Sequence, residues 1–274
     1  MKTLTPIAAA MLMALSVNTS ANNNTALLFQ LGNGNMADAD QSDPPIHNNL
    51  IVQTQIGGIN NSGAFQTTGT NNSVTIQLQT GESNFARSFQ TVGTSHSSSL
   101  ANQIGSSNSA VINQDGATAS SALINQTGSL HRGAVFQSPA TTSSALLNQI
   151  GSLHMGIATQ FSTTETSALL NQAGSMNIGS TFQSNTTASR ALLNQVGFSH
   201  NATISQTNVT ASSALVNQVG SMNGATIAQT GAALSLASTT QVGGNNMHNT
   251  IQTGTGQIAI AVQIGSGNMG MITQ

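Results

Sequence analysis

Residues that suit a buried face alternate with polar residues along most of the chain, with a period of two. In 143–149 the alternate residues are Ser, Ala, Leu and Gln, and in 154–160 they are His, Gly, Ala and Gln. Alternation over six or seven residues is typical of a β-strand with one buried face. A glycine lies in the short break between the two stretches, so we predict a strand, a tight turn and a second strand.

This strand–turn–strand unit recurs along the chain with the signature Gln-x-Gly-x-x-(Asn or His)-x5-Gln. The first glutamine recurs every 23 residues, at Gln103, Gln126, Gln149, Gln172, Gln195, Gln218 and Gln241. The second glutamine keeps the same spacing, at Gln114, Gln137, Gln160, Gln183, Gln206, Gln229 and Gln252. Further copies start at Gln30, Gln55, Gln79 and Gln263, which gives eleven units.

One such unit cannot bury its own inner face, whereas stacked units bury each other's. We therefore predict an all-β fold: a two-sheet β-solenoid of the cross-β type with about eleven strand–turn–strand rungs. Rungs about 4.8 Å apart would form a rod of roughly 50 Å. The pattern does not determine the handedness of the solenoid.

Amide side chains on the buried face need hydrogen-bond partners, because an unpaired buried amide costs about 1–3 kcal/mol. A column of identical amides supplies them, since each carbonyl accepts from one neighbouring rung while each NH2 donates to the other. We expect the two series of glutamines to form such ladders. The asparagines expected to form a further ladder are Asn108, Asn177, Asn223 and Asn246. Aliphatic columns would supply most of the stability, and the amides would fix the register.

Glycines follow the first glutamine by two residues, at Gly105, Gly128, Gly151, Gly174, Gly197, Gly220 and Gly243. A tight connection at this point predicts a positive φ, which glycine adopts without steric cost. The other turn of each unit is polar and more variable. Pro139 falls in one of these turns, outside both strands, where it removes no sheet hydrogen bond.

The first residues have the pattern of a secretory signal peptide: a basic start, an apolar run over 7–17 and small residues up to Ala21. We expect residues 1–21 to be removed. Residues 22–49 are predicted to form an N-terminal segment with a possible first rung and a Pro-containing loop. We interpret Asp38 to Asn49 as a flexible loop that interrupts this first rung. Residues 50–274 are predicted to form the solenoid. No further segment is apolar enough to span a membrane.

Only 4% of the residues are charged, and the chain has no cysteine. So little charge favours self-association, and there is no basic patch for nucleic acid. The six acidic residues form no pair at matching positions of the repeat, so no catalytic or cofactor-binding pattern is present and we expect no enzyme activity.

Three histidines take the place of asparagine in the signature, His131, His154 and His200. Our preferred interpretation is that a neutral imidazole joins the amide column. The alternative is a metal site or a pH sensor, since His131 and His154 would lie about 5 Å apart on adjacent rungs.

Some outward positions of the predicted strands are also apolar. We expect an exposed leucine column at Leu100, Leu123, Leu146, Leu169, Leu192, Leu215 and Leu236. Asparagines lie beside it at Asn102, Asn125, Asn148, Asn171, Asn194 and Asn217, and the other sheet carries Phe65, Phe89, Phe136 and Phe182. Such a stripe favours lateral bundling of filaments, with a surface that is merely tolerated as the alternative.

The spacing Ser-x5-Gln-x-Gly-x-x-Asn-x5-Gln resembles the curlin repeat of curli fibre subunits over nearly the whole chain after residue 21. The pairs Ser97/Gln103 and Ser120/Gln126 carry its first half, and Asn108/Gln114 and Asn177/Gln183 carry its second. The chain departs from this family in its eleven units, in the three histidines and in having phenylalanine as its only aromatic residue.

The resemblance implies a Gram-negative bacterial protein, exported through an outer-membrane pore with a periplasmic chaperone, and it implies that residues 22–49 serve export recognition. It also implies polymerisation on a nucleator subunit into a fibre at the cell surface. The expected function is that of a structural subunit of a secreted amyloid fibre for adhesion and biofilm matrix, which grows by head-to-tail stacking of rungs. The alternatives are a soluble ligand- or ice-binding solenoid and, more weakly, a β-helical polysaccharide enzyme.

Overall fold

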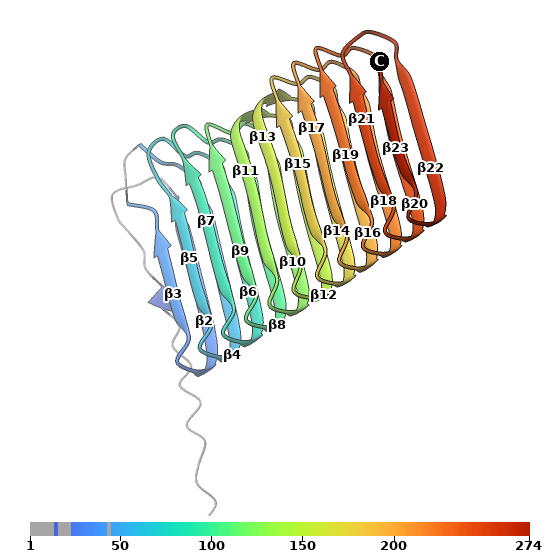
Figure 1. Cartoon of the computed structure of the whole chain (residues 1–274). Coiled ribbons are helices and arrows are strands. Elements are labelled where there is room, and N and C mark those ends of the chain that lie inside the picture. The colour runs from blue at the N-terminus through green and yellow to red at the C-terminus, as the bar shows by residue number, and fades with distance from the viewer. Residues whose placement is uncertain (1–13, 16–22, 43–44) are drawn as a thin grey trace, which may run out of the picture.

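The computed structural model describes residues 14–15, 23–42 and 45–274, and it contains two long β-sheets that face each other (Figure 1). Each rung has one strand in each sheet, and eleven rungs follow one another from the N-terminal end of the stack to the C-terminal end. The predicted all-β, two-sheet β-solenoid with about eleven rungs is therefore confirmed.

The first sheet has twelve strands, of which all but β1 pair in parallel with their neighbours. They are β1 (Ala14–Leu15), β2 (Thr25–Asn33), β4 (Leu50–Gly58), β6 (Val74–Glu82), β8 (Ser98–Ser106), β10 (Ser121–Ser129), β12 (Ser144–Ser152), β14 (Ser167–Ser175), β16 (Arg190–Phe198), β18 (Ser213–Ser221), β20 (Leu236–Gly244) and β22 (Ile258–Ser266).

The second sheet has eleven parallel strands in the same order along the stack. They are β3 (Met36–Asp40), β5 (Asn61–Gln66), β7 (Phe85–Thr91), β9 (Ser109–Asp115), β11 (Arg132–Thr141), β13 (Met155–Thr164), β15 (Ile178–Ser184), β17 (Asn201–Thr207), β19 (Gly224–Thr230), β21 (Met247–Gln252) and β23 (Met269–Thr273). The prediction that Pro139 lies outside both strands is wrong, because Pro139 falls near the end of β11.

Successive rungs stack residue upon residue at the spacing of the sequence repeat. Gln126 pairs with Gln103 on one side and with Gln149 on the other. The register also holds where the repeat length changes, because Gln30 pairs with Gln55 and Gln241 pairs with Gln263. Equivalent positions of the repeat therefore form continuous columns along the stack.

Two kinds of connection join the strands. The first arc connects a first-sheet strand to the second-sheet strand of the same rung. The second arc connects that second-sheet strand to the first-sheet strand of the next rung. The second arc absorbs the differences in repeat length. Gln66 and Ser73 are separated by one residue more than Gln114 and Ser120, although each pair spans a second arc. Both sheets remain in register because the difference is confined to this edge.

The interior is filled by matching large side chains of the first sheet to small residues of the second. Leu147 and Leu170 are fully buried, and both methyl-bearing ends approach Gly156, where a Cβ atom would overlap Leu147. Interiors pack at the density of organic crystals, so this pairing lets the two sheets approach without voids. Ile112, Ile204 and Ile227 supply the bulk from the second sheet in other rungs.

The first rung continues the same architecture. Residues 36–40 of the acid-rich segment lie in β3, so the segment that we interpreted as a loop, Asp38 to Asn49, begins within a strand. The following second arc buries Ile46 and pairs His47 with Asn71 in an isolated bridge. The dipeptide of β1 pairs antiparallel with Leu27 and Leu28 of β2, while the rest of the predicted signal peptide lies outside the described residues.

Among the residues that the structure describes, none form a helix that is long and apolar enough to cross a membrane. Among the described strands, β22 and β23 each pair on one side only, so the C-terminal end of the stack is open. Their outward side chains are strongly exposed and apolar, among them Ile260, Val262 and Ile264.

Candidate functional site

Two glutamine ladders run through the solenoid from the first rung to the last. In the ladder of the first sheet, each Nε2 donates to Oε1 of the next glutamine over 2.7–3.0 Å. In the ladder of the second sheet the same bonds measure 2.6–3.2 Å. The structure places every predicted ladder glutamine in these columns, and all bonds run in one direction.

The second amide hydrogen of most ladder glutamines joins the two sheets. Gln149 Nε2, in the first sheet, donates to the carbonyl of Arg132 in the second sheet over 3.1 Å. Gln160 Nε2, in the second sheet, donates to the carbonyl of Ser144 in the first sheet over 3.1 Å. An NH2 group has two hydrogens, so one bond follows the stack and the other crosses it.

The asparagine column ends the first arc and bonds to the backbone of the next rung. Asn108 Oδ1 accepts the backbone N–H of His131 over 3.1 Å, and Asn108 Nδ2 donates to the carbonyl of Gly128 over 3.1 Å. Asn223 forms the same pair of bonds, to the N–H of Asn246 and the carbonyl of Gly243. Asn177 and Asn246 lie in this column as well. Asn108 and Asn223 thus satisfy two backbone groups of the tight arc each, and do not bond amide to amide as we predicted for an asparagine ladder.

The three histidines of the signature occupy the asparagine column and reproduce part of its bonding. His131 Nδ1 accepts the backbone N–H of His154 over 3.3 Å, and His154 Nδ1 accepts that of Asn177 over 3.2 Å. The other ring nitrogen, Nε2, faces a carbonyl oxygen: Thr127 for His131 and Ile150 for His154. A carbonyl can only accept, so Nε2 carries the proton and each ring is neutral.

The rings of His131 and His154 are stacked, with centroids 5.0 Å apart and planes 3° from parallel. Burial is the largest cause that lowers the pKa of His131, and the neighbouring His154 lowers this pKa further. Burial likewise lowers the pKa of His154 and of His200, against the carbonyls that face their Nε2 atoms. With both ring nitrogens engaged, these histidines have no lone pair left for a metal ion.

Glycine is required in the first arc for two reasons. The column glycines have φ between 107° and 132°, which L-residues rarely adopt. A Cβ atom on Gly151 would also overlap the carbonyl oxygen of Gly174 in the next rung, and the same holds at every column glycine up to Gly243. Gly265, in the last rung, has no such neighbour.

Sequence reasoning missed one further polar column, a short inner glutamine ladder. In it Gln53 donates to Gln77 over 2.8 Å, and Gln53 Oε1 is buried without a partner because Leu28 lies in the rung below. The serines that the alternation placed on the buried face do form a column at the end of the second arc, in which Ser97 Oγ accepts the N–H of Ser120 over 3.2 Å.

The outward leucines form a half-buried column from Leu100 to Leu215, with one correction at its end. Leu236 pairs with Ser213, and Ser238 takes the position that continues the column from Leu215. More exposed aliphatic residues, such as Ile150 and Val196, line a parallel column nearer the first arc. On the second sheet the phenylalanines are interrupted by polar residues, and only Phe65 and Phe89 stack, at 5.0 Å.

Among the described residues, no group of three or more His, Cys, Asp or Glu side chains is placed to hold a metal ion. A scan of protein-family models gives no match to this chain, and a search of curated proteins gives none either. The resemblance to the curlin repeat therefore stays a prediction that rests on the repeat motif.

Proposed function

We propose that this protein is the structural subunit of a fibre, in which copies stack head to tail and continue both glutamine ladders across each junction. A solenoid with glutamine and asparagine ladders is compatible with such a role. The observation that carries the proposal is the match between the two terminal rungs.

The last rung repeats the pattern of the first rung in both glutamine ladders, in the column glycine and in the asparagine column, where Asn268 corresponds to Asn35. Strands β22 and β2 each have nine residues, with glutamine sixth and glycine eighth. If the register continued, Gln263 would lie over Gln30 of a second copy, and Gly265 over Gly32. The second-sheet ladder would continue in the same way from Gln274 to Gln41.

The ladder polarity also fits at this junction. Gln263 Nε2 donates to the carbonyl of Met247 and leaves one amide hydrogen without a partner. Gln30 and Gln41 begin their ladders, and no described glutamine donates to their Oε1 atoms. In the structure β1 pairs with part of the outer edge of β2, and β1 belongs to the predicted signal peptide. Once that peptide is removed, a second copy would place free donors against free acceptors, as open strand edges also invite.

Gly265 allows a sharp test of this register. In the single chain a Cβ on Gly265 would make one ordinary contact, with Asn268 Nδ2 at 3.7 Å. In the stacked register it would overlap the carbonyl of Gly32 of the next copy, as the other column glycines would overlap the next rung. Gly265→Ala should therefore remove the ability of the C-terminal end to accept a copy, at the expense of backbone strain in the last rung alone.

We expect Gly265→Ala to assemble at least tenfold more slowly than the wild type, followed by Thioflavin T fluorescence and electron microscopy. Added in small proportion to wild-type seeds, it should also cap their growth. Gly267→Ser is the matched control, because Gly267 lies in the same arc and Ser107 and Ser199 occupy the equivalent position with positive φ. Normal assembly of Gly265→Ala, or its failure to cap seeds, would contradict the proposed junction.

The resemblance to curli subunits supports further parts of the proposal. The fibre would lie outside a Gram-negative cell and serve adhesion and biofilm matrix. The partners would be further copies of the chain, a nucleator subunit, an outer-membrane export pore and a periplasmic chaperone. The role requires no catalysis and no cofactor. Detection of fibres on the producing cells, with the mature chain beginning near Asn22, would test this part.

One observation favours the alternative of a soluble ice-binding solenoid. Exposed threonines form a column along the edge where the second-sheet strands lead into the next rung, at Thr118, Thr141, Thr164, Thr187 and Thr210. The column is one residue wide and lies on the narrow edge, which offers less flat surface than either sheet. Ice recrystallisation assays on the unassembled chain would decide between the two functions.

A further inference from the structure

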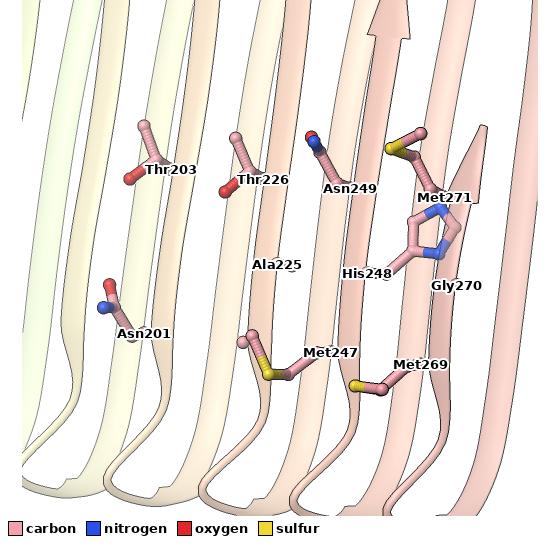
Figure 2. Close-up of a pocket in the computed structure, with 11 residues that line it drawn as sticks. Asn201, Thr203, Ala225, Thr226, Met247, His248, Asn249, Met269, Gly270 and Met271 are labelled. Carbon is pink, nitrogen blue, oxygen red and sulfur yellow. The ribbon is translucent and has the colours of Figure 1, made fainter. Parts of the chain in front are cut away.

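Three methionines gather on the outer face of the second sheet in its last two rungs. Met247, Met269 and Met271 line one pocket of about 450 Å³, together with residues of β17 and β19 (Figure 2). Gly224 pairs with Met247 on the neighbouring strand and has no side chain. Its position therefore forms part of the pocket beside the methionine side chains. The three methionines are 59%, 81% and 69% exposed, so a solute can reach them.

The strand register sets the spacing of these side chains. Met247 pairs with Met269 on the neighbouring strand, and two backbone steps along β23 bring Met271 to the same face. Neighbouring strands are about 4.8 Å apart, and alternate residues are about 6.6 Å apart. In the structure the sulfur of Met271 lies apart from those of Met247 and Met269 (Figure 2). The three side chains are exposed, long and unbranched, so rotation about their side-chain bonds can bring the three thioether sulfurs to one point.

The chemistry of the pocket indicates which ion it suits. Its lining holds no carboxylate, thiolate or cationic side chain, and its polar groups are Asn and Thr side chains and one histidine. Hard cations such as Mg²⁺ and Ca²⁺ require several oxygen ligands, often charged. Thioethers are soft, neutral ligands that select soft ions, above all Cu⁺ and by the same chemistry Ag⁺.

His248 lies next to Met247 in the sequence but belongs to the inner face. Strand alternation directs its side chain inward, where it is buried and its Nε2 bonds to Thr250 over 3.0 Å. Its Nδ1 is buried without a partner beneath Gly270. Because the strand backbone separates this ring from the sulfurs, we leave it out of the ligand set.

We propose that Met247, Met269 and Met271 form a binding site for one soft monovalent cation, Cu⁺ or Ag⁺. The site lies within a single copy and on the outer face of the sheet. It therefore does not depend on fibre formation, and its failure would leave the proposed function untouched.

The test is a calorimetric titration of the purified chain with silver nitrate in chloride-free buffer, repeated with Cu⁺ under anaerobic conditions against a competing chelator. We expect one equivalent to bind to the wild type. The variant Met247→Leu/Met269→Leu/Met271→Leu should bind at least tenfold more weakly, and it should retain the fold because leucine conserves the volume.

The matched control is Met155→Leu/Met176→Leu/Met222→Leu, which removes three methionines that lie singly on different rungs. The control should bind like the wild type. Two results would overturn the proposal: no stoichiometric binding by the wild type, or equal loss of binding in both triple variants, which would indicate scattered adsorption to exposed sulfur.

Discussion

Asparagine and histidine are interchangeable in the column after the first arc because both offer an acceptor and a donor in similar places. Asn108 Oδ1 and His131 Nδ1 each accept the backbone N–H of the next rung. Histidine can replace asparagine here only when its ring is neutral. A proton on Nδ1 would turn this nitrogen into a donor, and two donors would then face each other. At the residue scale, the column therefore selects hydrogen-bonding geometry and excludes charge.

This arrangement predicts that the solenoid loses stability in mild acid. The pKa of His131, His154 and His200 is lowered in the folded chain by burial, whereas in the unfolded chain it is about 6.5. Because the folded state disfavours the proton, the contribution of the neutral rings is complete above about pH 6.5 and is lost as the pH falls below it.

We expect the guanidinium concentration that dissolves wild-type fibres to fall between pH 7.5 and pH 5. Replacing the three histidines by asparagine should remove most of this fall. His96→Asn is the control, because His96 is exposed in a second arc. An equal pH dependence in the triple variant would show that other groups are responsible.

The two arcs differ in how much variation they tolerate, and this difference sets the repeat at the scale of the element. The first arc holds the glycine with positive φ, a second residue with φ between 53° and 59° such as Leu153 or Met176, and the asparagine column. Each of these groups bonds or packs against the next rung. The second arc varies in length while the register of both sheets is kept.

A single inserted glycine should therefore be tolerated in one arc and not in the other. An extra glycine between Asp115 and Gly116 lengthens a second arc to the size found after Gln66. The added loop-closure entropy lowers the free energy of unfolding by well under about 1 kcal/mol. An extra glycine between Ser129 and Leu130 displaces His131 and orphans buried backbone groups at about 1–3 kcal/mol each.

The two insertion variants can be compared by the guanidinium midpoint of fibre dissolution and by the kinetics of assembly. The second-arc variant should behave like the wild type, and the first-arc variant should be clearly weaker. Equal behaviour of the two would mean that the first arc is not the rigid part of the repeat.

At the scale of the whole molecule, the outer face of the first sheet is unusually poor in charge. Arg190 is its only charged residue from β8 to β22, and half-buried leucines run beside asparagines, of which Asn194 donates to Asn217 over 2.9 Å. A face this apolar and this regular favours contact with an identical face, because a second filament has columns of the same spacing.

Replacing Leu146, Leu169 and Leu192 by serine should therefore thin fibre bundles and leave single filaments intact, as seen by electron microscopy. The matched control replaces Thr141, Thr164 and Thr187 by serine in the threonine column of the same region. Bundles of unchanged width in the leucine variant would rule out this face as the lateral contact.

The sequence by itself determined the fold class, the number of rungs and the members of both glutamine ladders. It could do so because in-register stacking places residues one repeat apart in direct contact, so Gln126, Gln149 and Gln172 are neighbours in space by their spacing alone. The same logic corrects the leucine column, since one repeat after Leu215 lies Ser238 rather than Leu236.

Only the tertiary structure decided what happens between the two sheets and at the ends of the stack. The fit of Leu147 against Gly156, the cross-sheet bonds of glutamines such as Gln149 and the placement of Met247, Met269 and Met271 around one pocket depend on how the arcs place one strand over another. The spacing of the repeat does not predict these contacts. Some of them join positions that are not one repeat apart, and others depend on the direction of a side chain.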